Sequence, residues 1–281
     1  KAVGLSLTEP RCGSDAAALK TTATRQGDVY LLNGGKSSAS VTEANAHVVF
    51  AKTDPTAGHK GISAFLVPLD TSDPRLQRSV FGDFGVKPIS RGAFTFKDYP
   101  VPAENLLGKE GEGFYMIMGD FDFSRAAIGL LCLGPTESAL EDAMEYSKQR
   151  TTFGMPLAKY EAISFKFSEA ATQIEMMRML CYKTLWLRDK GLPHTKEAAM
   201  CKWYIPQTCA HIILDLAQTF GHLGYTDEYP EMNRMADVIG FIQGDGSPEI
   251  NKIVIARELM GRVAVPYDFR DVPAMAKAAG H

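Results

Sequence analysis

The sequence lacks any apolar run long enough to cross a bilayer, and it lacks a strong excess of charge of either sign. A membrane-spanning helix needs about 20 consecutive apolar residues, so no membrane span is expected. The formal net charge is -3 and the lysines and arginines form no runs, which argues against a nucleic-acid-binding protein. With 281 residues, 45% of them hydrophobic, the chain can form one large or two ordinary globular domains.

Cysteine pairs with C-x-x-C spacing and histidine clusters are also missing. The five cysteines are scattered along the chain, and their odd number predicts free thiols in a reducing compartment. The six histidines stand singly, so we expect no bound metal. The chain begins Lys1-Ala2-Val3, with neither an initiator methionine nor a signal peptide, and we therefore expect it to be the remainder of a longer protein.

The sequence pattern changes near residue 110. Residues 1–110 hold short β-branched or aromatic runs between Gly-, Pro- and Asp-rich turns, which predicts a small antiparallel β-barrel or sandwich. Residues 111–265 hold helical patterns, roughly 114–149, 157–190 and 195–222, then a short helix within 225–240 and a last one after residue 247. Residues 266–281 have little core pattern and are expected to form a tail. The expected fold class is α+β, a β domain followed by a helical bundle. The expected strands are AVGLSL, VYLLN, AHVVFAKT, ISAFLVP and AFTFKD.

One carboxylate, that of Asp245, stands between two glycines immediately ahead of the last helical pattern. Ser247 suits the N-cap of that helix and Pro248 suits its first turn. A helix N-terminus offers unpaired N–H groups to an anion or a carbonyl oxygen, so a neighbouring carboxylate can act on whatever these groups hold. Spacing alone leaves two interpretations open, a catalytic loop or a plain cap before a core helix. The apolar residues at the spacing of a buried helical face are Ile250, Ile253, Val254 and Leu259.

A second polar loop, Leu7 to Asp15, reads LTEPRCGSD and follows the first strand pattern. It concentrates hydroxyls, a glycine and main-chain donors in a few residues. Such loops can cradle a phosphate or the polar edge of a flat ring, and a plain turn is the alternative.

The LTEPRCGSD loop resembles the L-T-E-P-x-A-G-S-D signature of acyl-CoA dehydrogenases, flavoenzymes that oxidise acyl-CoA thioesters to enoyl-CoA. The resemblance covers residues 1 to about 265 and implies FAD as the cofactor. It also implies the middle β domain and the C-terminal four-helix bundle of that family, without its N-terminal helical domain, so a separate N-terminal domain or subunit is expected to close the acyl pocket. Further matches, in the family's order, are Gly61 to Val67, Val101 to Gly108, Arg150 to Gly154, Gln218 with Gly221 and Gly224, and Ile255 to Glu258.

The resemblance assigns the first cofactor contacts to the β domain. The hydroxyls of Thr8 and Ser14 would face the isoalloxazine and the pyrophosphate, and Ser14 the CoA region as well. Ser38 and Ser40 stand where family members often place Trp and Thr over the flavin. Ser40 keeps a hydroxyl near flavin N5, whereas Ser38 lacks the ring that screens the cofactor, so altered solvent or oxygen access is expected.

Further cofactor contacts are assigned to the helical domain. Arg150 matches the arginine that reaches across a subunit interface to a neighbour's FAD, and Phe153 would pack near the same cofactor. Gln218 and Gly221 match the segment that borders the adenosine half. Ser247 aligns with the threonine of the family's Gly-Thr pair. These matches imply a homodimer or tetramer.

The resemblance also locates the base and the substrate contacts. Counting back from Ala256-Arg257-Glu258 without a gap, Asp245 falls on the family's catalytic glutamate, which removes the proton α to the thioester while flavin N5 accepts a hydride. Gly246 borders the thioester. Asp122 and Arg125 match contacts to CoA, and a solvated i, i+3 pair is the alternative.

An aspartate base is about 1.5 Å shorter than a glutamate, taking one C–C bond as the difference. In the family an aspartate is a feature of dehydrogenases for alicyclic thioesters, including cyclohexane- and cyclohexenecarboxyl-CoA, so an alicyclic or branched acyl group is expected. Electrons would pass to an electron-transfer flavoprotein or a similar acceptor, in a bacterial cytoplasm or a mitochondrial matrix. The alternatives are an enoyl-CoA reductase, an oxygen-using relative, or a non-catalytic partner subunit.

Overall fold

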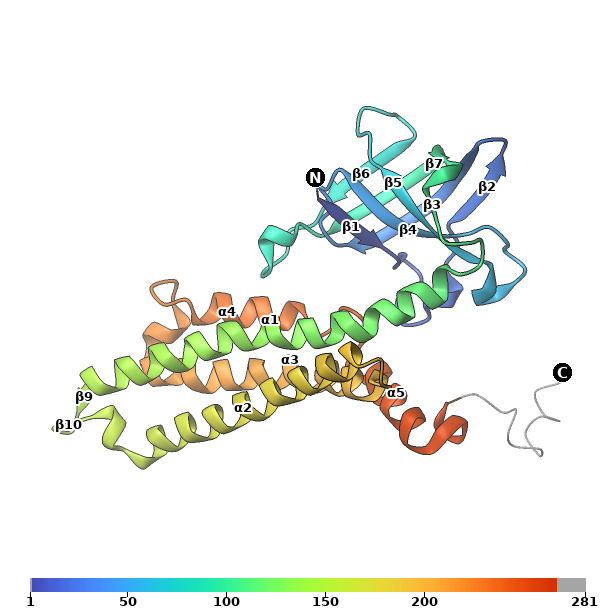
Figure 1. Ribbon diagram of the computed structural model, residues 1–281. Helices are drawn as coiled ribbons and strands as arrows, with labels where there is room; N and C mark the ends of the chain where they lie inside the picture. Colours follow the sequence, from blue (N-terminus) through green and yellow to red (C-terminus); the bar gives the residue numbers. More distant parts are fainter. Residues whose placement is uncertain (1, 267–281) are drawn as a thin grey trace. The chain divides into compact units, whose positions relative to one another are not determined.

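The computed structural model describes residues 2–266, which divide into two compact units, one ending at Asp120 and the other beginning at Phe121 (Figure 1). The first is built on a sheet and the second on helices. From residue 267 on, the tail expected over 266–281 lies outside the described residues.

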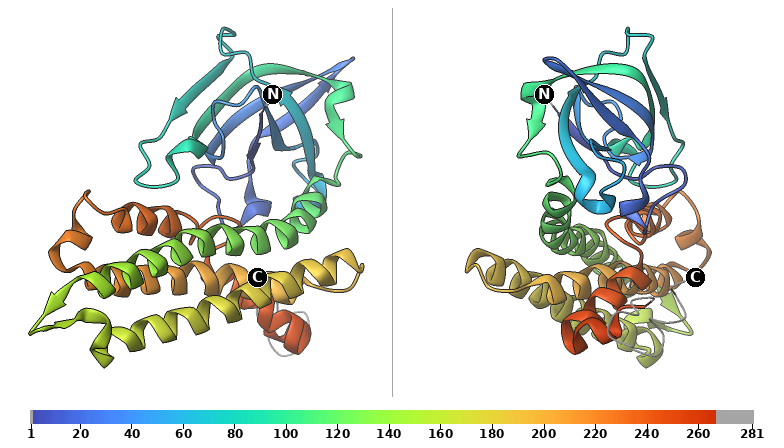
Figure 2. Two further views of the ribbon diagram at one scale, coloured as in Figure 1. Left: turned by 60° about the vertical axis from the view of Figure 1, so that its left-hand side comes forward. Right: turned by 90° about the vertical axis from the view of Figure 1, so that its right-hand side faces the viewer.

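The first unit holds one eight-stranded sheet, which curls on itself (Figure 2). The strand order is β6-β7-β3-β2-β4-β5-β8, and β1 pairs with β4. The strands are β1 (Val3–Ser6), β2 (Thr22–Gln26), β3 (Val29–Ala39), β4 (Ala46–Lys52), β5 (Ile62–Pro68), β6 (Leu76–Val80), β7 (Gly92–Pro102) and β8 (Leu106–Leu107). Short 3-10 turns cover Ala16–Ala18, Gly58–Gly61, Lys87–Ile89 and Ala103–Asn105.

The five expected strands are present as β1, β3, β4, β5 and β7. The sheet is mixed rather than purely antiparallel, because β1 runs parallel to β4 and β2 meets β4 in parallel at one register position. Sequence patterning missed β2, β6 and β8 because few of their side chains are apolar and buried; β6 buries only Leu76. Aromatic side chains fill the core, where the rings of Tyr30 and Phe65 meet edge to face with centroids 4.8 Å apart.

The second unit is a helical bundle, which confirms the expected fold class. The helix α1 begins in the first unit and continues into the second. The helices are α1 (Gly113–Gln149), α2 (Glu161–Asp189), α3 (Thr195–Ala217), α4 (Glu231–Gly240) and α5 (Pro248–Met260). Between and after them lie a hairpin of β9 (Thr151–Thr152) and β10 (Met155–Pro156) and 3-10 turns over Leu157–Lys159, Gln218–Tyr225 and Gly261–Ala264.

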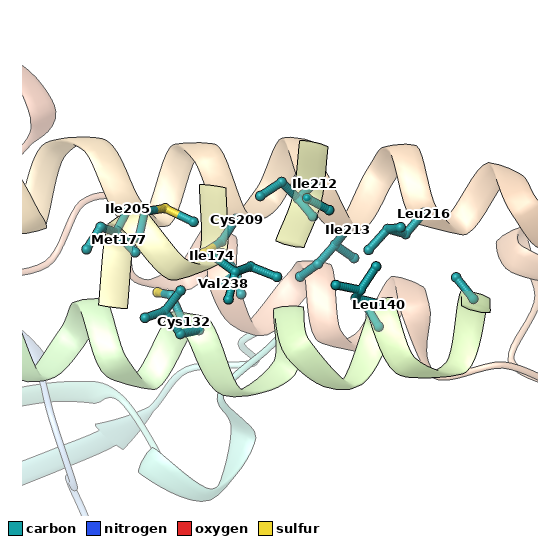
Figure 3. Close-up of a cluster of buried hydrophobic side chains, with 14 of the residues drawn as sticks. Cys132, Leu140, Ile174, Met177, Ile205, Cys209, Ile212, Ile213, Leu216 and Val238 are labelled. Atoms are coloured by element: carbon teal, nitrogen blue, oxygen red, sulfur yellow. The ribbon is translucent and has the colours of Figure 1, made fainter. Parts of the chain in front are cut away.

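The helix α3 is central to the bundle, as its side chains show in Figure 3. Its residues are buried nearly all round, and Ile205, Cys209 and Ile213 pack in one cluster with Cys132 of α1 and Ile174 of α2. The helix α2 buries a single stripe at alternating spacings of four and three residues, which is the pattern of a helix covered on one side. That stripe consists of Ala170, Ile174, Met177, Cys181 and Thr184.

The expected buried face of α5 is half-buried in the single chain at Ile250, Ile253 and Val254, and the expectation is wrong at Leu259. The residues of α5 that are fully buried are Pro248 and Asn251, while Leu259 is 64% exposed. The apolar periodicity was real, but a periodic pattern does not show whether the chain's own residues cover the face.

Candidate active site

The loop Ile242 to Ser247 connects α4 to α5 and holds Asp245 in a left-handed backbone conformation, with φ 52°. A positive φ is uncommon for a residue other than glycine, and it occurs mostly where surrounding contacts enforce it. The next residue, Gly246, has φ 96°. Ser247 is the N-cap of α5, and its Oγ accepts a hydrogen bond from the Ile250 N–H at 3.4 Å, which confirms the expected cap.

Two neighbouring residues of α1 bind Asp245 directly. The Ser124 hydroxyl donates to the Asp245 carboxylate at Oδ2. The Arg125 Nε donates to the Asp245 main-chain carbonyl at 3.1 Å. The carboxylate and the backbone of Asp245 are therefore each held by α1. Sequence reasoning missed Ser124, because no local pattern connects residues 121 positions apart.

The Asp122–Arg125 pair is buried, so the alternative of a solvated surface pair is wrong. Arg125 Nη1 lies 3.4 Å from Asp122 Oδ1, and the two side chains are 6% and 13% exposed. Thr195, at the start of α3, donates to the other Asp122 oxygen at 2.5 Å. Burial lowers the pKa of Arg125, and the charges of Asp122 and Asp245 oppose that effect. The pair thus joins α1, α3 and the Asp245 loop.

Lys202 is a second buried cation near the loop, and sequence reasoning missed it. Its side chain, on α3, is 1% exposed, and Nζ donates to the Ile242 carbonyl at 2.9 Å. Burial lowers the pKa of Lys202 to about 8, and the Asp245 carboxylate opposes that shift. The available sequence signal was a lysine on a helix whose neighbours are otherwise apolar.

In the first unit, the LTEPRCGSD loop is anchored from within. The Glu9 carboxylate accepts hydrogen bonds from the Lys20 and Thr21 N–H groups at 2.6 and 2.9 Å and pairs with Lys36 Nζ at 2.8 Å. Lys36 also donates to the Leu7 carbonyl at 3.1 Å. Burial disfavours the Glu9 carboxylate, but Lys36 and the other donors outweigh it and lower the Glu9 pKa. Thr8 is left half-buried and Ser14 exposed at the surface of this anchored loop.

The segment from Ser38 to Val41 lies beside that loop. The Ser37 N–H donates to the Thr8 carbonyl at 2.9 Å, and Ser40 forms a bridge with Leu5 of β1. Ser38 is exposed and has φ 53°. The structure thus brings the segments of Thr8, Ser38 and Ser40 together, in the first unit.

His47 supports the Ser38 to Val41 segment from the core. Its Nε2 hydrogen bonds to the Val41 carbonyl at 3.0 Å, so the Nε2–H is the donor. Its Nδ1 lies 2.9 Å from the Ser6 hydroxyl. Val41 also has a positive φ, 55°, so this ring holds a strained turn in place.

The remaining expected cofactor residues lie at the other end of the bundle from Asp245. Ser124 lies in α1 and Arg150 directly follows its last residue, 26 residues further on, which is about 40 Å at 1.5 Å per residue. Phe153 is 95% exposed in the β9–β10 turn, and Gln218 accepts a hydrogen bond from Lys166 at 2.8 Å. Gly221 has φ 63° and open space where a side chain would stand. Of the helical set, the structure therefore brings Asp122, Arg125, Asp245, Gly246 and Ser247 together, and keeps Arg150, Phe153, Gln218 and Gly221 apart from them.

Within residues 2–266, no three His, Cys, Asp or Glu side chains are grouped so as to hold a metal ion. The helices described in that range are all too short or too polar to span a membrane.

Comparisons with known proteins agree on one family. The acyl-CoA dehydrogenase middle domain matches residues 4–99, and the acyl-CoA dehydrogenase C-terminal domain matches residues 111–260. An acyl-CoA dehydrogenase of Bacillus subtilis is 37% identical over 91% of this chain and 68% of its own length. The caffeyl-CoA reductase-Etf complex subunit CarC of Acetobacterium woodii is 33% identical over 92% of this chain and 69% of its own length.

Solved structures agree with the sequence matches. The butyryl-CoA dehydrogenase of Megasphaera elsdenii superposes with a TM-score of 0.87 at 36% identity, over 92% of this chain and 68% of that structure. The chain spans 62% of the length of the mouse mitochondrial short-chain specific acyl-CoA dehydrogenase, which is 38% identical. The chain belongs to the acyl-CoA dehydrogenase family, whose members are flavoprotein oxidoreductases with FAD as their cofactor.

Proposed function

We propose that the protein catalyses the FAD-dependent α,β-dehydrogenation of an acyl-CoA thioester, with Asp245 as the base. The observation that carries the proposal is a carboxylate held in a strained loop at the N-terminus of α5 by Ser124 and Arg125. In this assignment residues 1–110 contribute flavin and acyl-CoA contacts, and residues 111–265 contribute the base and further contacts.

The side chains of this chain fit a flavin dinucleotide. Hydroxyl and main-chain donors gather at Thr8, Ser38 and Ser40 on one surface of the first unit, as the polar edge of a flavin requires. Arg150 is exposed directly after the end of α1, so its guanidinium is accessible to a pyrophosphate. The open space at Gly221 admits close approach of a ligand to the backbone. FAD, when bound, supplies the acceptor for the electron pair, which no side chain can supply.

Asp245 removes the proton from the carbon α to the thioester carbonyl. A general base must be held within hydrogen-bond reach of that proton, and the Ser124 hydroxyl restricts the rotation of the carboxylate. Pro248 has no N–H, and the Ile250 N–H already donates to Ser247 Oγ. We therefore assign the main-chain N–H of Asp245 to the thioester oxygen, where negative charge develops as the proton leaves. The loop needs glycine at position 246, because φ there is 96° and a Cβ would lie 3.2 Å from the Asn251 side-chain nitrogen. Asp122 and Arg125 are assigned to CoA in the same proposal.

The length of α1 supports an active unit of at least two chains. Arg150 and Asp245 are separated by about 40 Å in one chain, which is too far for both to act on one flavin near its reactive ring and its phosphates. A second copy that supplies Arg150 resolves the separation, so we infer a homodimer or a tetramer.

Mixing two inactive variants tests this arrangement. Co-expressed Asp245→Asn and Arg150→Met chains are expected to recover roughly a quarter of the wild-type rate, because half of random dimers are mixed and one of their two sites is intact. If Asp245 and Arg150 served the same site from the same chain, every site would carry one defect and no activity would return. The measurement is acyl-CoA oxidation by the purified mixed dimers, with each variant alone as the control.

The shorter base favours an unusual acyl group, and we propose an alicyclic or branched thioester. Asp245→Glu is expected to shift the substrate preference toward straight-chain acyl-CoA, because the base then extends about 1.5 Å further, and displacements of this size change rates roughly a hundredfold. The measurement is kcat/KM for cyclohexanecarboxyl-CoA and butyryl-CoA in both proteins. An unchanged ratio of the two values would contradict the proposed link between base length and substrate.

The physiological electron acceptor is proposed to be an electron-transfer flavoprotein or a similar carrier. The exposed Ser38, which leaves the flavin without a screening ring, favours a second candidate, an oxygen-using relative. The match to a caffeyl-CoA reductase-Etf complex subunit keeps reduction of an enoyl-CoA as a further candidate.

The five cysteines are free and buried, consistent with a reducing compartment such as a bacterial cytoplasm or a mitochondrial matrix. Anaerobic bleaching of the flavin by an acyl-CoA panel, followed by admission of oxygen, separates the dehydrogenase, the oxygen-using relative and the enoyl-CoA reductase. It also separates all three from a non-catalytic partner subunit.

A further inference from the structure

The loop that carries Asp245 is held by its carbonyl groups. The Ile242 carbonyl accepts from Lys202 Nζ at 2.9 Å, and the Asp245 carbonyl accepts from Arg125 Nε at 3.1 Å. The Asn251 amide donates to the Gly246 and Ser247 carbonyls at 2.9 and 3.0 Å. Side chains from α3, α1 and α5 thus fix this loop from three directions.

Among the side chains that bind the loop, Lys202 is the one whose position is not explained by local structure. Asn251 belongs to the helix that the loop begins, and Arg125 also pairs with Asp122. Lys202 instead places an ammonium group, 1% exposed, on the core helix of the bundle. Burying a charge is strongly unfavourable unless other groups compensate it, so an apolar residue would serve the core better. The compensation comes from the Ile242 carbonyl and from the charge of Asp245.

We propose that Lys202 is a positioning residue, which anchors the loop that carries Asp245 and holds the Asp245 carboxylate in the ionised form that a base requires. This inference rests on the proposed role of Asp245. Asp245 is half-buried, partial burial favours the protonated form of a carboxylate, and a nearby cation opposes that tendency. The other charged or titratable groups that act on this cluster are Asp122, Arg125 and Cys132 from α1 and Arg257 from α5.

Neutral replacement of Lys202 tests the charge. In a profile of flavin-reduction rate against pH, the acidic limb is the fall in rate toward low pH. In the full-length protein with FAD bound, Lys202→Met and Lys202→Gln are expected to move this limb to higher pH by about one unit, because loss of a neighbouring cation raises the pKa of a carboxylate. Lys202→Arg keeps the charge and is expected to keep the limb at its wild-type position. The rate is followed by anaerobic stopped-flow absorbance with saturating acyl-CoA from pH 5 to 9.

Lys252→Met is the matched control. Lys252 is an exposed lysine of α5, stacked over the Trp203 ring, and its removal changes the net charge equally. Solvent screens its charge, so the acidic limb should stay in place.

A second readout does not depend on turnover. Because burial lowers the Lys202 pKa below its unfolded value, the folded protein loses the Lys202 proton at lower pH than the unfolded chain does. The wild-type melting temperature should therefore rise relative to that of Lys202→Met as the pH increases above about 8. Equal melting temperature differences at pH 7 and pH 10 would contradict the buried, charged state of Lys202.

The outcomes distinguish this inference from the proposed function. If no acyl-CoA reduces the wild-type flavin, the proposed function fails. If the wild type is reduced and the acidic limbs of Lys202→Met and wild type coincide, Lys202 serves only the fold and this inference is overturned. It is equally overturned if both neutral variants fail to fold while Lys202→Arg folds but shows a shifted limb.

Discussion

Replacing Asp245 with asparagine is expected to slow the reduction of bound flavin by acyl-CoA by about 10³-fold while FAD is retained. An amide cannot accept the α proton, yet its oxygen can still accept the hydrogen bond from Ser124. The main-chain bond from Arg125 to residue 245 does not depend on the side chain. The variant therefore removes the base and leaves the loop intact. Anaerobic stopped-flow absorbance of the flavin measures the rate.

Glu249→Gln is the control for this experiment. Glu249 is an exposed carboxylate in the first turn of α5, four residues after Asp245, and its removal should leave the rate within about a factor of three, as expected of a solvated side chain outside the reaction. The opposite pattern, a parental rate in Asp245→Asn and a large loss in Glu249→Gln, would assign the base to Glu249.

Lys36→Met is expected to destabilise the first unit by about 3–5 kcal/mol, the range for breaking one side of a buried ion pair. Lys36 is 1% exposed and its ammonium compensates the charge of Glu9. Without it, the Glu9 carboxylate stays buried with only main-chain donors, and the LTEPRCGSD loop loses the tie between Leu7 and Glu9. Urea unfolding followed by circular dichroism measures the free energy, and flavin absorbance reports the loss of FAD that we expect from a loosened loop.

The pH dependence of the Lys36 effect has a defined sign. The Glu9 pKa is lowered from 4.5 in the folded protein, so the ionised carboxylate contributes stability above pH 4.5 and loses it as the pH falls through the folded value. The difference in the free energy of unfolding between wild type and Lys36→Met should therefore shrink as the pH falls below 4.5 and through the lowered folded pKa of Glu9.

Arg75→Met is the matched control for Lys36→Met. It breaks an ion pair with Asp73 in which the Arg75 side chain is 49% exposed. Such a pair is worth at most about 1 kcal/mol. Equal destabilisation by the two variants would contradict the role assigned to the buried pair.

The helices were predictable from sequence because each has an apolar pattern and a clear stop. The expected helices at 114–149 and 195–222 correspond to α1 and to α3 with its 3-10 extension. The strands were less predictable, because β6 places a single buried residue, Leu76, in a polar segment. The partner of a strand was not predictable at all, since the parallel pairing of β1 with β4 joins residues that are 43 positions apart.

The candidate site was predictable only where its chemistry is local. Gly244-Asp245-Gly246 and the Ser247 cap are contiguous, so their loop could be predicted as a unit. Ser124 and Lys202 come from α1 and α3, and only the packing of the bundle brings them to the loop. The apolar neighbours of Lys202 along the helix indicate a buried face, but the bond from Lys202 to the Ile242 carbonyl became visible only in the folded structure.

The most direct test of the proposed function is an anaerobic titration of the full-length, FAD-containing protein with a panel of straight-chain, branched and alicyclic acyl-CoA thioesters. The dehydrogenase account predicts that at least one thioester bleaches the visible absorbance of the oxidised flavin in wild type. The same thioester should leave the absorbance of Asp245→Asn unchanged. Unchanged absorbance of the wild-type flavin with every thioester would contradict it.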